Sequence, residues 1–117
     1  MSELTILDNM IGLFERPGTW CQGALAIDSI GRPVPSTSPQ ASRWCLLGAL
    51  VSFSQDSNPG EFENCALAIK HSIGEIYPEL LPFNVFLVDF NDDVAKDVED
   101  VLKVLRNTRK YLNKEEK

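Results

Sequence analysis

Most short motifs that mark a known chemistry are missing from this sequence of 117 residues. Neither a Walker A phosphate loop nor the dinucleotide pattern G-x-G-x-x-G occurs, so the standard nucleotide cradles are excluded. The G-x-S-x-G nucleophile elbow is absent as well. With a single histidine and no C-x-x-C pair, the sequence also offers no familiar zinc site. We therefore expect no metal and no cofactor.

The chain also lacks a basic stretch and a long apolar run. Its formal net charge is -6, and residues 1–88 contain nine acids but only four bases. Duplex nucleic acid and anionic membranes are therefore unexpected partners. The first residues show neither the basic start nor the apolar segment of a secretion signal. We expect a cytoplasmic protein.

Cysteine usage supports a reducing compartment. The three cysteines, Cys21, Cys45 and Cys65, are odd in number and widely spaced, which is not a disulfide framework. We expect free thiols, as in cytoplasmic proteins. With 44% hydrophobic residues and this length, the composition predicts one globular domain over residues 1–117. Its ordered core should span residues 4–112, and residues 113–117 should form a frayed tail.

Apolar residues at helical spacing predict four helices. The first covers residues 2–15, and the second residues 39–53, with Ser38 as its N-cap and Pro39 as its first residue. The second helix contains the apolar segment 44–50, so it should be buried. Its glycine, Gly48, should mark the close approach of another backbone.

The third and fourth helices have polar start signals. Asn58 and Glu61 form a capping-box pattern at the start of the third, and residues 91–93 should cap the last. Between these two helices, residues 83–90 are predicted to be extended. Residues 24–28 and 32–34 should pair as a short β-hairpin. The fold class is thus mainly α, with about four helices and a hairpin or extended insert between the first two.

Residue types for nucleophilic catalysis are present but poorly placed. Cys45, His71 and Asn91 supply a Cys-His-Asn set. Cys45 lies in the most apolar segment, where burial makes a thiol inert. His71 falls off the apolar stripe of its helix. We therefore favour a structural Cys45 and an exposed His71.

Three nearby carboxylates are the remaining candidates for metal ligation. Asp89, Asp92 and Asp93 have oxygen ligands of the kind that hard cations prefer. Their spacing matches no calcium loop, and helix capping explains them more simply. The sequence thus gives no metal site.

The richest mixture of chemical groups lies in residues 20–32. It combines an aromatic ring, an amide, a carboxylate and a guanidinium, a set able to hold a small planar ligand. The simpler alternative is that Trp20 covers the core and that Asp28 with Arg32 closes a turn. The ligand-binding candidates are Trp20, Gln22, Asp28, Arg32, Arg43, Trp44, Asn91 and Asp92.

These motifs, in this order, resemble a small family of uncharacterised bacterial and phage domains. Members share a W-x-Q-G-A segment, an aspartate with a Gly-Arg turn, an aromatic-led C-L-x-G-A-L helix and a late Asn-Asp pair. The matches span about residues 4–112, with a departure at Cys21 and no glycine-rich turn after Asn91-Asp92. The resemblance implies a shared fold and a bacterial or phage origin, and it implies no activity.

Each candidate catalytic arrangement has a simpler structural explanation, such as burial, helix capping or turn closure. We therefore expect a binding or interaction protein rather than an enzyme. Its target would be a small nucleotide-like molecule or a host protein. One alternative is a small enzyme with Asp28, Arg32, Asn91 and Asp92 around a pocket. A second alternative is a homodimer that uses the apolar second helix as its interface.

Overall fold

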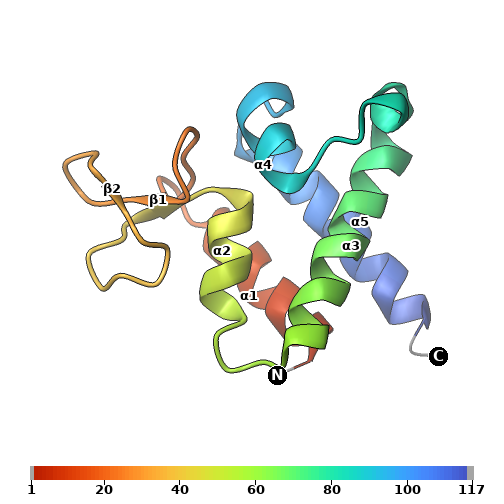
Figure 1. Cartoon of the computed structure of the whole chain (residues 1–117), viewed down its shortest axis with the longest axis horizontal. Helices are drawn as coiled ribbons and strands as arrows, with labels where there is room; N and C mark the ends of the chain where they lie inside the picture. The colour runs from red at the N-terminus through yellow and green to blue at the C-terminus, as the bar shows by residue number, and fades with distance from the viewer. Residues whose placement is uncertain (1, 116–117) are drawn as a thin grey trace.

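In a computed structural model the described residues, 2–115, form four longer helices, three very short strands and three short helical turns (Figure 1). The prediction of a mainly α domain is confirmed, although the helix count of four omits the short turns. No helix among residues 2–115 is long and apolar enough to cross a membrane. The elements are α1 (Glu3–Glu15), β1 (Ala26–Ile27), β2 (Pro33–Val34), β3 (Arg43–Trp44), α2 (Leu46–Phe53), α3 (Pro59–Ile76), the 3₁₀-helix η1 (Pro78–Phe83), α4 (Leu87–Asp89), the π-helix η2 (Phe90–Val94) and α5 (Val98–Glu115).

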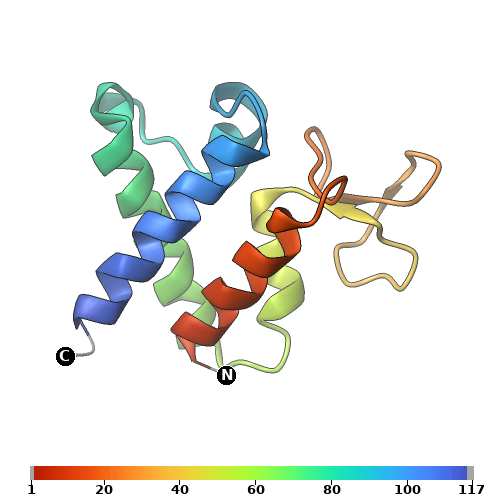
Figure 2. The ribbon, with the colours of Figure 1, turned by 180° about the vertical axis from the view of Figure 1, so that it is seen from behind.

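The longer helices pack around one core. Helix α5 lies against both α1 and α3, and α2 packs on α1, α3 and α4, while the strands project to one side (Figures 1 and 2). Helix α2 is thus enclosed by other helices, as its apolar composition predicted. The largest fully buried side chains are Phe14, Phe90, Ile6, Leu7, Met10, Leu46, Leu50, Ile69, Ile73, Leu102, Leu105 and Val101.

The predicted hairpin is present, and a third strand extends it. Strand β1 lies between β2 and β3 and pairs antiparallel with both, so that Ala26 faces Val34 on one side and Trp44 on the other. Trp44 also forms an isolated parallel bridge with Trp20. The third strand was not predicted, because Arg43-Trp44 was assigned to the second helix.

The start predicted for the second helix, at Pro39, is wrong. The helix begins at Leu46, and its N-cap is Cys45, whose sulfur accepts a hydrogen bond from the Gly48 N–H at 3.3 Å. The preceding residues are held in the sheet instead, where they form cross-strand hydrogen bonds. Ser38 does act as a cap, but of a tight turn, since its hydroxyl oxygen accepts from the Gln40 N–H. Cross-strand pairing thus overrode helical propensity here.

The extended structure predicted for residues 83–90 is also wrong. Residues 78–83 form the 3₁₀-helix η1, and α4 follows at Leu87 after a left-handed Asn84. The N-cap of helix α4 is Phe86, whose backbone N–H donates to the Asp89 carboxylate. The run was too short for periodicity to separate a strand from short helical turns.

The prediction that residues 91–93 cap the last helix is wrong. They belong to the π-helix η2, whose five-residue spacing is shown by the Ala95 N–H bond to the Phe90 carbonyl. The turn before α5 is closed instead by Asp97, whose carboxylate accepts from the Asp100 N–H. Helix α5 runs to Glu115, so residues 113–115, predicted as frayed, are helical. Residues 116–117 lie outside the described residues.

The other predictions for helices are confirmed. Helix α1 covers Glu3–Glu15, within the predicted range of residues 2–15, and its N-cap is Ser2; Asn58 and Glu61 form the predicted capping box of α3. Gly48 does mark a close backbone approach, because a Cβ there would lie 2.0 Å from the Leu25 carbonyl oxygen. That carbonyl also accepts the Cys45 N–H at 3.0 Å. The absence of a side chain at Gly48 therefore lets the residue 20–25 loop rest on the start of α2.

A substitution of Gly48 by alanine tests this contact. We expect Gly48→Ala to destabilise the fold by more than about 2 kcal/mol, since the added methyl overlaps a backbone atom that cannot rotate away. The matched control is Gly12→Ala in α1, where a Cβ meets nothing within 4 Å. That change should stabilise by about 0.5–1 kcal/mol through helix propensity. Urea denaturation of both variants measures the difference, and equal effects would contradict the close approach.

Candidate functional site

The side chain of Asn91 is the centre of a buried hydrogen-bond network. Its Oδ1 accepts from the Trp20 Nε1–H at 2.7 Å and from the Leu46 N–H at 3.0 Å. Its Nδ2 donates to the Cys21 carbonyl at 3.0 Å and to Asp92 Oδ1 at 2.9 Å. The side chain is fully buried. All four hydrogen-bonding positions of the amide are thus used.

Gln22 and Gly23 tie the same two chain segments together from the other direction. The Gln22 Nε2 donates to the Asn91 carbonyl at 2.9 Å and to the Ala95 carbonyl at 3.1 Å. The Gly23 N–H donates to Asp92 Oδ1 at 3.1 Å. We call Trp20, Gln22, Gly23, Asn91 and Asp92 the clamp, since it joins residues about 70 positions apart in sequence.

The π-helix explains how Asn91 reaches this position. Its wider turn places Phe90 and Asn91 in the interior, while Asp93 remains exposed. There Asn91 accepts the first N–H of α2, a group that has no partner within its own helix. The clamp therefore fixes the start of α2 as well as the residue 20–25 loop.

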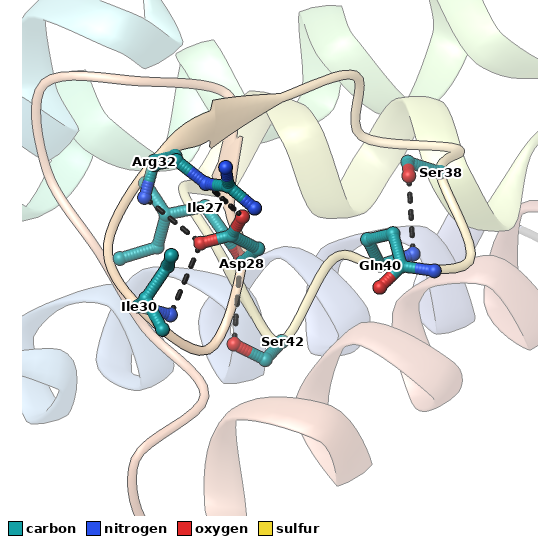
Figure 3. A network of polar contacts seen from close by, with 7 residues as sticks. All are labelled: Ile27, Asp28, Ile30, Arg32, Ser38, Gln40 and Ser42. Carbon is teal, nitrogen blue, oxygen red and sulfur yellow. Dashed lines mark hydrogen bonds and ion pairs between the residues drawn. The ribbon is translucent and has the colours of Figure 1, made fainter.

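Asp28 and Arg32 form a separate arrangement at the β1–β2 connection (Figure 3). The Asp28 carboxylate accepts from the backbone N–H groups of Ile30 and Arg32 and pairs with Arg32 Nε at 2.9 Å. The Arg32 backbone bond, followed by its guanidinium and the Ile30 N–H, lowers the pKa of Asp28 below its usual value. These contacts match the simpler interpretation, in which the pair closes the turn.

The four residues of the enzyme hypothesis divide into two places. Asp28 and Arg32 lie on the connection between β1 and β2, whereas Asn91 and Asp92 lie in η2, directly after α4. The hydrogen bonds and ion pairs of the described residues do not link one pair to the other. The geometry does not bring them together around one pocket, so it gives the enzyme hypothesis no support.

The two remaining binding candidates are next to each other in β3. The Trp44 Nε1–H donates to the Ser36 carbonyl at 3.0 Å, which holds the residue 35–42 loop against the sheet. The Arg43 side chain is exposed. Ligand binding by the eight candidates stays a prediction, but seven of the side chains are engaged in internal hydrogen bonds: Trp20, Gln22, Asp28, Arg32, Trp44, Asn91 and Asp92.

The cysteines and His71 do not form a catalytic set. All three cysteines are buried and free. Burial, with smaller effects from nearby charges, raises the pKa of Cys21 to about 11 and that of Cys65 to about 12, and burial also raises the pKa of Cys45. His71 is exposed on α3, where it lies beside Glu75 and the Tyr111 ring. The predicted burial of Cys45 and exposure of His71 are confirmed.

No group of three or more His, Cys, Asp or Glu side chains in residues 2–115 is placed to hold a metal ion. Asp89 and Asp92 have other roles. The Asp89 carboxylate accepts the Phe86 N–H at the start of α4, and Asp92 belongs to the clamp.

Two features next to the clamp were not predicted. The first is a cavity of about 210 Å³, lined by Gly23, Ala24, Leu25, Cys45, Val88 and Asp92. The second is a set of exposed apolar side chains in the η1–α4 region, which we call the 81–88 surface: Leu81, Phe83, Phe86 and Val88. The compact apolar run in residues 83–90 was the only sequence signal for the second feature, and it had been interpreted as a strand.

Fold and site together define a small, mainly helical domain, in which a buried asparagine clamp holds a short sheet against the helices. A family model described as "Family of unknown function (DUF6197)" matches residues 2–111. The chain therefore belongs to the DUF6197 family. No curated protein and no solved structure matches it. The family resemblance is confirmed at this level, while the bacterial or phage origin stays a prediction.

Replacing Asn91 should be the most damaging polar substitution in the clamp. Asn91→Ala leaves the Trp20 Nε1–H, the Leu46 N–H and the Cys21 carbonyl without their partner. We expect a loss of about 3–5 kcal/mol, because each unsatisfied buried polar group costs about 1–3 kcal/mol. Chemical denaturation followed by tryptophan fluorescence measures this loss. Asn113→Ala, at an exposed position of α5, should change stability by less than about 0.5 kcal/mol. Similar small values for both variants would contradict the role of the clamp.

The Asp28–Arg32 pair should make stability depend on pH. Because folding lowers the pKa of Asp28, its contribution is present above the unfolded-state pKa of about 3.9 and is lost as the pH falls through the folded-state value. Asp28→Asn should therefore be less stable than the native chain at pH 7. The difference should shrink below about pH 4. Denaturation at several pH values tests this, and a constant difference would refute it.

Proposed function

We propose that this protein is an interaction module that binds a protein partner through the 81–88 surface. The single observation that carries the proposal is that four exposed apolar side chains fall within eight consecutive residues there. Phe83 is 73% exposed, Leu81 67% and Phe86 54%. Soluble monomers rarely leave several large apolar groups exposed together, and aromatic side chains are enriched at the centres of interfaces.

Local contacts hold this surface in a defined shape. Lys70 of α3 donates to Asn84 Oδ1 at 2.5 Å, and its ammonium lies 4.1 Å from the centre of the Phe86 ring. Leu81 covers Gly74 of α3, where a Cβ would lie 2.6 Å from the Leu81 side chain. The surface is therefore anchored on α3, which limits the entropy lost when a partner binds.

The charge of the surrounding segment specifies the partner further. Residues 78–95 contain four acids, Glu79, Asp89, Asp92 and Asp93, and no lysine or arginine. Lys70 is the cation that the structure places within this region. An apolar surface among acids favours a partner segment with apolar and basic side chains. A second copy of this chain, docked through the same surface, would instead bring like charges together.

A pair of synthetic amphipathic peptides tests the proposal. One is built from leucine and lysine, and the other from leucine and glutamate. In NMR titrations the leucine–lysine peptide should shift the amide signals of residues 81–88, and the leucine–glutamate peptide should bind at least about tenfold more weakly, a difference of about 1.4 kcal/mol. Light scattering of the protein alone should show the 13.1 kDa monomer.

Matched double variants separate the surface from general apolar exposure. Phe83→Ser with Phe86→Ser should weaken the leucine–lysine peptide at least about tenfold. Serine at residue 86 is a good N-cap, so α4 should persist. The control, Ile30→Ser with Leu67→Ser, removes two exposed apolar groups elsewhere and should change affinity less than twofold. The proposal is refuted if both double variants weaken peptide binding equally. It is also refuted if the protein forms a dimer that the Phe83→Ser, Phe86→Ser variant dissociates.

A further inference from the structure

The cavity next to the clamp adjoins the 81–88 surface at one residue, Val88. Val88 belongs to both, and Leu25 on the opposite chain segment is also partly exposed, at 42%. The cavity thus has apolar walls at the point where it meets the surface. Its volume is about 210 Å³. Ligand sites for drug-sized molecules usually measure about 300–1,000 Å³, so a nucleotide does not fit here.

Asp92 lines this cavity, and the clamp holds its carboxylate in a fixed orientation. Both hydrogen bonds that the described residues donate to the carboxylate end on Oδ1, from the Gly23 N–H and from Asn91 Nδ2. No ion pair between described residues involves Asp92. The second oxygen, Oδ2, therefore keeps its capacity to accept from a ligand.

The other polar group in the cavity wall is the Cys45 thiol. Burial raises the pKa of Cys45, so the thiol is neutral at pH 7, and its sulfur already accepts from the Gly48 N–H. Asp92 is consequently the one charged side chain in the cavity lining. Apolar walls with one carboxylate match a ligand that has an aliphatic stem and a cationic end.

The size of the cavity and the single available oxygen narrow the choice of cation. A volume of 210 Å³ holds about seven waters at about 30 Å³ each, which is enough for a lysine side chain with its five non-hydrogen atoms beyond Cα. An arginine prefers a two-pronged contact with both carboxylate oxygens. Oδ1 of Asp92 is already taken twice, so the geometry favours an ammonium, which makes point contacts.

We propose that this cavity is a lysine pocket, which receives a lysine side chain from the partner docked on the 81–88 surface. The ammonium donates to Asp92 Oδ2, and its methylene stem lies against Leu25 and Val88. This inference rests on the proposed function and deepens it, because it names the residue type that the partner must present beside its apolar contacts. It also gives the clamp a second role, as the support that orients the carboxylate.

Two variants with the same change of charge test the pocket. Asp92→Asn keeps an oxygen that can accept from the Gly23 N–H but removes the charge. Asp93→Asn removes the charge of the exposed neighbour. Asp92→Asn should weaken the leucine–lysine peptide at least about tenfold, and Asp93→Asn less than about threefold. The native protein should bind a leucine–arginine peptide at least fivefold more weakly than the leucine–lysine peptide, and Asp92→Asn should abolish this preference.

A small probe tests the pocket independently of the partner surface. At constant ionic strength, n-butylammonium chloride should shift the amide signals of Gly23, Leu25 and Asp92, whereas n-butanol should not. These shifts should survive in the Phe83→Ser, Phe86→Ser variant, so a failure of the proposed function leaves this result intact. Equal peptide affinities of Asp92→Asn and Asp93→Asn would overturn the lysine pocket, even where the phenylalanine variants confirm the surface. Absence of the n-butylammonium shifts would overturn it too.

Discussion

The fold depends on the amide of Asn91, which lies where three parts of the chain meet. It accepts from the Trp20 indole and the first N–H of α2, and it donates to the carbonyl of Cys21 and the carboxylate of Asp92. A buried amide that uses all four of its hydrogen-bonding positions contributes far more to the free energy of unfolding than a surface contact does. The reason is that the loss of any partner leaves a polar group buried without a hydrogen bond. Three other features stabilise this junction. They are the π-helix η2, the absence of a side chain at Gly48, and the hydrogen bonds that Gln22 donates to the Asn91 and Ala95 carbonyls.

The same junction determines which groups remain for recognition. Side chains that suggested a binding site, such as Trp20, Gln22 and Asn91, are used in holding the sheet to the helices. What is left at the surface is different in kind: apolar side chains of η1 and α4, and one oriented carboxylate in a small cavity. A rigid support of this type is what a binding surface needs, since ordering side chains on association opposes affinity.

Local signals predicted those parts of the fold in which sequence neighbours determine the structure. The capping box at Asn58, the amphipathic stripes of the long helices and the turn closed by Asp28 all appear as expected. The predictions failed where distant pairing decides. Residues 39–45 have helical composition, yet Trp44 is held in the sheet by β1, and Asn91 looked like a helix cap although it is the centre of the clamp. The eight site candidates include four of the five clamp residues, Trp20, Gln22, Asn91 and Asp92, which the sequence analysis assigned to ligand binding. The structure shows that their hydrogen bonds join distant chain segments.

By itself the sequence determined a mainly α domain, its long helices, its free buried thiols and the need for a bare backbone at Gly48. Each of these follows from side-chain periodicity or from the physical properties of single residues, which act over a few positions. Only the tertiary structure decided that residues about 70 positions apart share one hydrogen-bond network and that Leu81, Phe83, Phe86 and Val88 stay exposed. Both outcomes depend on how the helices pack, and periodicity within a short apolar run carries no information about that packing.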